Sequence, residues 1–132
     1  MKKTCSLIMV KPDAIHRKLV EEIERKLNDD NLQIIKRKKV IINRKIILRL
    51  WPKIFRQITL EHSFNYLGGI PLPIWLICGP NAITVTLQVK AEMRELYCID
   101  KLHTLFHCPD TEEDFVKEYE IFFKDEPLLK LS

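Results

Sequence analysis

Residues 7–15 of the chain read LIMVKPDAI, in which a short apolar run is followed by a basic residue, a proline and an acidic residue. The apolar run predicts a buried β-strand over residues 6–10. Asp13 is a suitable N-cap for a single helix after that strand. The apolar residues expected on the buried face of this helix are Ile15, Leu19, Val20, Ile23 and Leu27. Lys11 therefore falls where a strand ends and a helix begins, the place where open sheets usually bind ligands.

Strands and helices alternate along the rest of the chain. Further strands are predicted at residues 32–42, at residues 74–78 and at a short apolar segment that ends at His107. No internal repeat or linker divides the sequence, and 46% hydrophobic residues are ordinary for a folded protein. We therefore expect one domain over residues 1–132, of α/β or α+β class with a single sheet.

The helices are predicted from their capping residues. Asn43 precedes a helix that Pro52 should kink or divide into two. Asn81 precedes another helix, and residues 95–104 are expected to be mostly loop. Before the last helix lies Asp110-Thr111, either member of which is a suitable cap.

Glycine is scarce, with only Gly68, Gly69 and Gly79 in 132 residues. A Walker loop and a dinucleotide-binding fingerprint both need glycines at fixed spacings that these three do not provide. If this protein binds phosphates, it must do so mainly with side chains, with or without a helix N-terminus.

The charge pattern, the apolar runs and the cysteines limit the class of protein, and the last two favour a cytoplasmic one. The net charge is 22 − 18 = +4. The densest cluster of basic residues, at 36–39, is either the solvated middle of a strand or a surface that contacts the phosphate backbone of a nucleic acid. No apolar run suits a signal peptide or approaches the ~20 residues that span a membrane. The four cysteines have neither C-x-x-C nor zinc spacing, so we expect reduced thiols.

Two side chains near the last helix are candidates for catalysis. His107 is either an ordinary loop residue or a nucleophile, since an imidazole with a pKa of ~6.5 is mostly neutral at physiological pH. Glu118 lies at the margin of the apolar stripe that contains Phe115 and Phe122, where an unpaired carboxylate would be costly to bury. A contact between Glu118 and His107 would fix the imidazole tautomer and leave the other ring nitrogen free to attack.

Three segments, in the same order along the chain, resemble nucleoside diphosphate kinases. They are residues 7–15, the Asn81-Ala82-Ile83 segment after Gly79, and His107-Cys108-Pro109-Asp110-Thr111 followed by Glu118. The resemblance covers nearly the whole chain. It implies a ferredoxin-like α/β sandwich in which helices cover an antiparallel sheet.

The resemblance also implies an activity. Members of this family transfer the γ-phosphate of a nucleoside triphosphate such as ATP to a nucleoside diphosphate, by a ping-pong route through phosphohistidine, with Mg²⁺ on the nucleotide phosphates. Carried over, His107 is the nucleophile, Glu118 orients its imidazole, and Lys11 and Arg94 bind phosphate. The family forms homo-oligomers built from dimers, and we expect neither a membrane nor nucleic acid as a partner.

Several family positions carry different residues here. Trp51 stands at a tyrosine of the nucleotide site, and Thr104 replaces an asparagine three residues before the nucleophile. Leu87 takes the place of an arginine in the helix before a shortened segment between Asn81 and Arg94, and this gap removes a family threonine that touches phosphate.

The position of the nucleobase-stacking phenylalanine falls on Thr59 or Leu60, with Phe55 or Phe64 as possible substitutes. Leu60 is our expected nucleotide-binding residue there, beside Trp51, Arg94 and Thr104. Two functions follow: a divergent working kinase, or a catalytically weak or inactive kinase-fold protein that binds nucleotides or a partner.

Overall fold

An antiparallel sheet of four strands forms the centre of the computed structural model, which describes residues 3–54, 56–97 and 103–123. Its strands run in the order β2-β3-β1-β4, so β1 and β3 are the central pair. Their bounds are Lys3–Val10 for β1, Gln33–Ile41 for β2, Pro71–Pro80 for β3 and Phe106–His107 for β4. This arrangement confirms the predicted single sheet.

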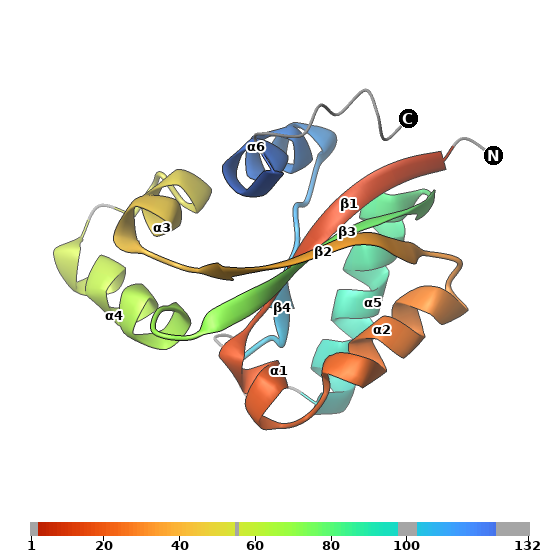
Figure 1. Cartoon of the computed structure of the whole chain (residues 1–132), viewed down its shortest axis with the longest axis horizontal. Helices are drawn as coiled ribbons and strands as arrows, with labels where there is room; N and C mark the ends of the chain where they lie inside the picture. Colours follow the sequence, from red (N-terminus) through yellow and green to blue (C-terminus); the bar gives the residue numbers. More distant parts are fainter. Residues whose placement is uncertain (1–2, 55, 98–102, 124–132) are drawn as a thin grey trace.

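Helices cover both faces of the sheet, α2 and α5 on one and α3, α4 and α6 on the other (Figure 1). The helices are α1 Pro12–His16, α2 Val20–Asp29, α3 Arg44–Leu50, α4 Gln57–Leu67, α5 Ala82–Tyr97 and α6 Glu112–Phe123. Because side chains alternate along β1, Leu7 and Met9 pack under α3, α4 and α6, whereas Ile8 and Val10 pack under α2 and α5. The fold thus has two hydrophobic cores, one on each side of the sheet.

The prediction of a single helix after Asp13 is wrong. The chain forms two helices, α1 and α2, and Lys18 between them has a φ of 59°. Lys11, rather than Asp13, is the N-cap residue of α1. Asp13 lies in the first turn of α1 and is buried, because its carboxylate binds partners outside the helix.

Other predicted boundaries hold. Asn43 caps α3 by accepting a hydrogen bond from the Ile46 amide over 2.8 Å, and Pro52 lies in the break between α3 and α4. Thr111 caps α6, since its hydroxyl accepts from the Asp114 amide over 3.0 Å. The predicted loop at residues 95–104 is wrong at its start, because α5 continues to Tyr97, and its residues 98–102 lie outside the described part.

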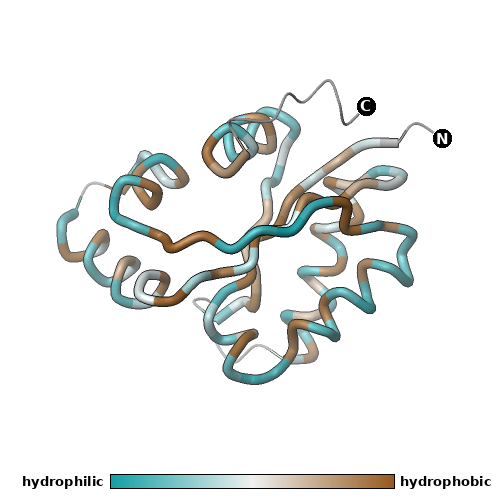
Figure 2. The backbone as a smooth tube through the Cα atoms, viewed as in Figure 1, coloured by the Kyte–Doolittle hydropathy of each residue, from teal (hydrophilic) through white to brown (hydrophobic). Residues whose placement is uncertain are grey.

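The basic cluster at residues 36–39 lies in the middle of the end strand β2, and its four residues are exposed. Figure 2 shows this middle part of β2 as hydrophilic between more hydrophobic ends. Arg37 forms two hydrogen bonds with Glu24 of α2, over 3.0 and 2.6 Å. These features agree with the interpretation of a solvated strand.

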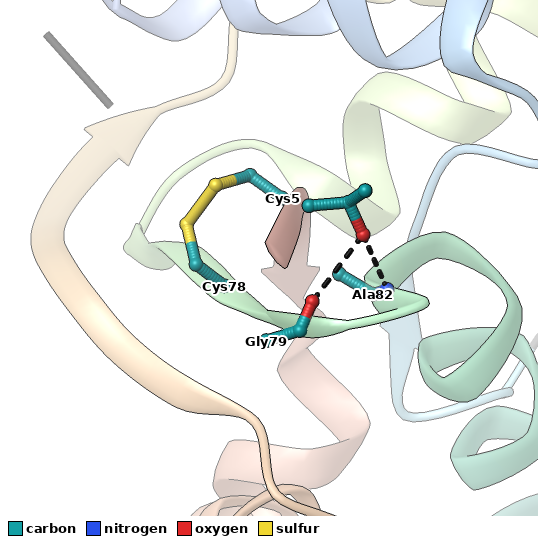
Figure 3. The surroundings of a disulfide bond; sticks show 5 residues. Cys5, Cys78, Gly79 and Ala82 are labelled. Atoms are coloured by element: carbon teal, nitrogen blue, oxygen red, sulfur yellow. Dashed lines mark hydrogen bonds between the residues drawn. A yellow bond between two sulfur atoms is a disulfide. The ribbon is translucent and has the colours of Figure 1, made fainter. Parts of the chain in front are cut away.

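The expectation of reduced thiols is wrong for two cysteines. Cys5 and Cys78 face each other in the register of β1 and β3 and form a disulfide, with their Cα atoms 4.1 Å apart (Figure 3). Next to it, the Thr4 hydroxyl donates to the Gly79 carbonyl over 3.3 Å and accepts from the Ala82 amide over 2.8 Å. The first turn of α5 is thereby attached to the central strands.

Among the helices in the described part of the chain, none is long and apolar enough to cross a membrane.

Candidate active site around His107

Strand pairing brings Lys11 and His107 into one region, although 96 positions separate them in the numbering. The short strand β4 pairs antiparallel with the end of β1, so that His107 lies opposite Met9. Directly after β1, the Lys11 amide donates to the Leu105 carbonyl over 2.8 Å. The ends of β1 and β4 therefore carry the lysine and the histidine that the sequence singled out.

Leu105, two residues before His107, has a φ of 72°, a backbone conformation that is unfavourable for a bulky side chain. Its amide donates to Oδ2 of the buried Asp13 over 3.0 Å, and its carbonyl accepts from Lys11. The Tyr66 hydroxyl donates to the other oxygen of the Asp13 carboxylate. Asp13 therefore links α1, α4 and the segment before β4, and it holds the backbone that leads into His107.

His107 and Glu118 are in contact, as their eleven-residue spacing predicted. Nε2 of His107 lies 3.0 Å from Oε1 of Glu118, and the two side chains are 16% and 7% exposed. Glu118 lies on α6 among side chains that include Phe115 and Phe122, so its carboxylate is held inside the protein. With Nε2 bound in this way, Nδ1 is the ring nitrogen left to react.

Trp51 also borders the histidine. It follows α3 as its C-cap residue, and its indole meets the His107 ring edge-on, with centroids 5.2 Å apart and planes at 70°. The break between α3 and α4 thus places an aromatic ring directly beside the imidazole.

Thr104 lies close to Lys11. Its hydroxyl is 3.0 Å from the Lys11 ammonium, which donates a hydrogen bond to it, and the residue is buried. Thr104 therefore helps to orient the cation at the end of β1, a contact that the sequence alone did not indicate.

A cavity of about 550 Å³ opens beside these residues. Three lysines (Lys11, Lys53 and Lys117), Asp114, Ser63 and Tyr66 supply its polar groups. Its apolar lining consists of Leu50, Trp51, Pro52, Ile54 and Leu67. An aromatic and aliphatic surface with a positively charged edge suits an organic anion such as a nucleotide. The sequence reasoning missed Lys53, Ser63, Tyr66, Asp114 and Lys117, which carry no local motif.

Three of the expected nucleotide-binding residues, Arg94, Leu60 and Thr104, lie outside the lining of this cavity. Arg94 is exposed in the last turn of α5, and Leu60 is buried in the core beneath α4. Of the alternatives to Leu60, Thr59 is exposed, and Phe64 packs against the guanidinium of Arg44.

Phe55, a further alternative, lies outside the described residues. Leu87, at the position of the family's arginine, packs against the core between the sheet and α5.

Cys108 follows the histidine directly and is buried. Burial raises the pKa of its thiol to about 12, so the thiol stays protonated at neutral pH. A protonated, enclosed thiol is a poor nucleophile, so Cys108 is not a candidate for the reactive group at this position.

The comparisons with known proteins agree with one another. The sequence model described as Nucleoside diphosphate kinase matches residues 4–128. A nucleoside diphosphate kinase of Sulfurisphaera tokodaii is 28% identical over 94% of this chain and 91% of its own length. One from Ignicoccus hospitalis is 24% identical over 93% of this chain and 90% of its own.

Solved structures show the same fold. A nucleoside diphosphate kinase family protein from Babesia bovis superposes with a TM-score of 0.80 at 20% identity, covering 95% of this chain and 90% of that one. The nucleoside diphosphate kinase of Encephalitozoon cuniculi also superposes with a TM-score of 0.80 at 20% identity, covering 96% of this chain and 93% of that one. The predicted ferredoxin-like sandwich is thereby confirmed. With a family model that spans almost the whole sequence, the chain belongs to the nucleoside diphosphate kinase family.

Proposed function

We propose that this protein is a working nucleoside diphosphate kinase, which transfers the γ-phosphate of a nucleoside triphosphate such as ATP to a nucleoside diphosphate through phosphohistidine. The observation that carries the proposal is the His107 imidazole, whose Nε2 is held 3.0 Å from the buried Glu118 carboxylate beside a cavity lined by lysines. Membership of the family supports the same reaction.

In the first half-reaction, the Nδ1 lone pair of His107 attacks the γ-phosphorus. A nitrogen–phosphorus bond forms, the bond from the γ-phosphorus to the β,γ-bridging oxygen breaks, and the nucleoside diphosphate leaves. Attack through Nδ1 makes the imidazole ring cationic, and the Glu118 carboxylate at Nε2 stabilises that charge. In the second half-reaction, a terminal oxygen of another nucleoside diphosphate attacks the phosphorus and frees His107.

The remaining residues have roles in binding. Lys11, oriented by Thr104, is placed to neutralise the transferred phosphoryl group. Trp51 offers an aromatic surface between the imidazole and the cavity. Arg94 and Leu60 remain predictions of the family resemblance, since neither lines the cavity.

Magnesium would come with the nucleotide. The charged groups that line the cavity are three ammonium groups and the single carboxylate of Asp114. This set fits a phosphate chain better than a bare divalent cation, which prefers several oxygen ligands. When bound to the phosphates, Mg²⁺ neutralises part of their charge during transfer.

A second candidate function is nucleotide or partner binding without turnover. It is favoured by Leu87, a partly buried apolar residue at a position where the family has an arginine, and by the exposed position of Arg94.

A transfer assay separates the two functions. Purified protein is mixed with ATP, Mg²⁺ and GDP, and the formation of GTP is followed over a matrix of both substrate concentrations. A working kinase gives parallel double-reciprocal lines, the pattern of a ping-pong route, and His107→Ala abolishes turnover. If GTP formation is absent, or if His107→Ala retains it, the proposal is wrong.

A further inference from the structure

The proposed reaction requires more positive charge than the expected residues bring to the cavity. Phosphoryl transfer depends on cations that neutralise the phosphate oxygens. Of the cations predicted for this task, Lys11 lines the cavity, whereas Arg94 does not. Leu87 supplies no charge at all.

Two other lysines supply charge at the same place. Lys53 lies in the segment between α3 and α4, two residues after Trp51. Lys117 lies on α6 directly before Glu118, the residue that holds His107. They reach the cavity from separate elements of the fold.

Both side chains are available to a ligand. Lys53 and Lys117 are exposed, and neither forms a hydrogen bond or ion pair with any residue in the described part of the chain. The comparable surface cations Arg25, Arg37 and Arg44 are all paired with glutamates. The charges of Lys53 and Lys117 are therefore not neutralised by a carboxylate within the described part of the chain.

We propose that Lys53 and Lys117 bind the phosphate chain of the nucleotide and replace the arginines that other family members use. The inference rests on the proposed function, because it concerns the same substrate. Lysine suits this replacement, since a flexible stem carries a point charge with three donors to phosphate oxygens.

Asp114 contributes a negative charge to the same cavity. It is one helical turn before Lys117 on α6 and is the one carboxylate residue in the lining of this cavity. Because a carboxylate repels phosphate, we expect the phosphate chain to contact the two lysines and to avoid the Asp114 carboxylate.

Binding measurements on the full chain test this inference. Isothermal titration calorimetry is performed with ADP in the presence of Mg²⁺ and, separately, with adenosine, which lacks phosphate. Lys53→Ala and Lys117→Ala are each expected to weaken ADP binding roughly tenfold and to leave adenosine binding unchanged. Lys53→Arg and Lys117→Arg should restore most of the ADP affinity, because the positive charge is retained. Lys45→Ala, at an exposed lysine of α3 outside the cavity, is the matched control and should bind ADP like the wild type.

Equal ADP affinities of the wild type and both alanine variants would overturn the inference, and so would a wild-type chain that does not bind ADP. Phosphorylation of His107 is measured on the same preparations to separate this result from the proposed function. A chain that needs both lysines for ADP but never phosphorylates His107 upholds the inference and contradicts the kinase activity. If His107 is phosphorylated while both alanine variants bind ADP like the wild type, the proposed function is supported and the role of the two lysines is contradicted.

Discussion

The Glu118 carboxylate on α6 lies 3.0 Å from Nε2 of His107 and is buried. The imidazole is therefore oriented by a carboxylate that is almost inaccessible to water. A carboxylate in this position selects one imidazole tautomer and leaves Nδ1 for the substrate. The proposed chemistry depends on this contact.

Glu118→Gln tests the contact. Glutamine retains the size of the side chain and a hydrogen-bonding oxygen but removes the charge that stabilises the phosphorylated ring. We expect phosphorylation of His107 by ATP to slow roughly 10- to 100-fold, as measured by rapid quenching, while the circular dichroism spectrum stays unchanged. Glu120→Gln, at an exposed position of the same helix, should react at the wild-type rate. An unchanged rate in Glu118→Gln removes Glu118 from its proposed role.

Asp13 is expected to be a residue on which stability depends. Its carboxylate accepts from the Tyr66 hydroxyl and from the Leu105 amide, so Asp13→Ala leaves two inward-facing donors without their partner. We predict a loss of about 2–4 kcal/mol in the free energy of unfolding, measured by urea denaturation. Tyr66→Phe removes one of these hydrogen bonds and should cost about 1 kcal/mol. A loss in Asp13→Ala no larger than that of Tyr66→Phe would contradict the linking role of Asp13.

The features that sequence reasoning predicted correctly are those with local signals. Asn43 and Thr111 cap their helices through hydrogen bonds to residues three positions away, which a sequence displays directly. The contact of His107 with Glu118 also spans only one loop and part of one helix, so its spacing was informative.

Features that depend on distant partners could not be predicted in this way. Asp13 resembles a helix N-cap in the sequence, but its carboxylate accepts a hydrogen bond from the amide of Leu105, 92 positions away. The disulfide between Cys5 and Cys78 arises from the register of two strands that pair across the chain. Lys53 and Lys117 line the same cavity only because α6 packs near the break between α3 and α4, so neither position stood out in the sequence.

Ser6 offers a substitution that should increase stability. Its hydroxyl is fully buried on β1 and is the buried side-chain polar atom without a hydrogen-bond partner in the described part of the chain. Ser6→Ala removes an unsatisfied group and is expected to raise the free energy of unfolding by about 1 kcal/mol.

Thr86 is the matched comparison for Ser6, since its hydroxyl is equally buried but donates to the Ala82 carbonyl over 2.6 Å. Thr86→Val should lower the free energy of unfolding by about 1 kcal/mol. Urea denaturation of both variants checks the opposite signs, and a destabilised Ser6→Ala would show that the Ser6 hydroxyl is satisfied.

The disulfide should contribute measurably to stability. It closes a loop of 73 positions and therefore restricts the unfolded chain, an effect of about 2–4 kcal/mol. Reductant is expected to lower the melting temperature of the wild type and to leave Cys5→Ala/Cys78→Ala unaffected. Because burial holds the pKa of Cys108 at about 12, its thiol should take little part in exchange at pH 8. Identical melting curves of the wild type with and without reductant would contradict this contribution.

The most direct test of the central claim is to locate the phosphate on the protein after incubation with γ-labelled ATP. We predict a base-stable, acid-labile label that mass spectrometry assigns to His107, that is absent from His107→Ala, and that a nucleoside diphosphate removes as the corresponding triphosphate. If folded protein that binds ATP acquires no label, or if His107→Ala is labelled to the same extent, His107 is not the phosphate carrier.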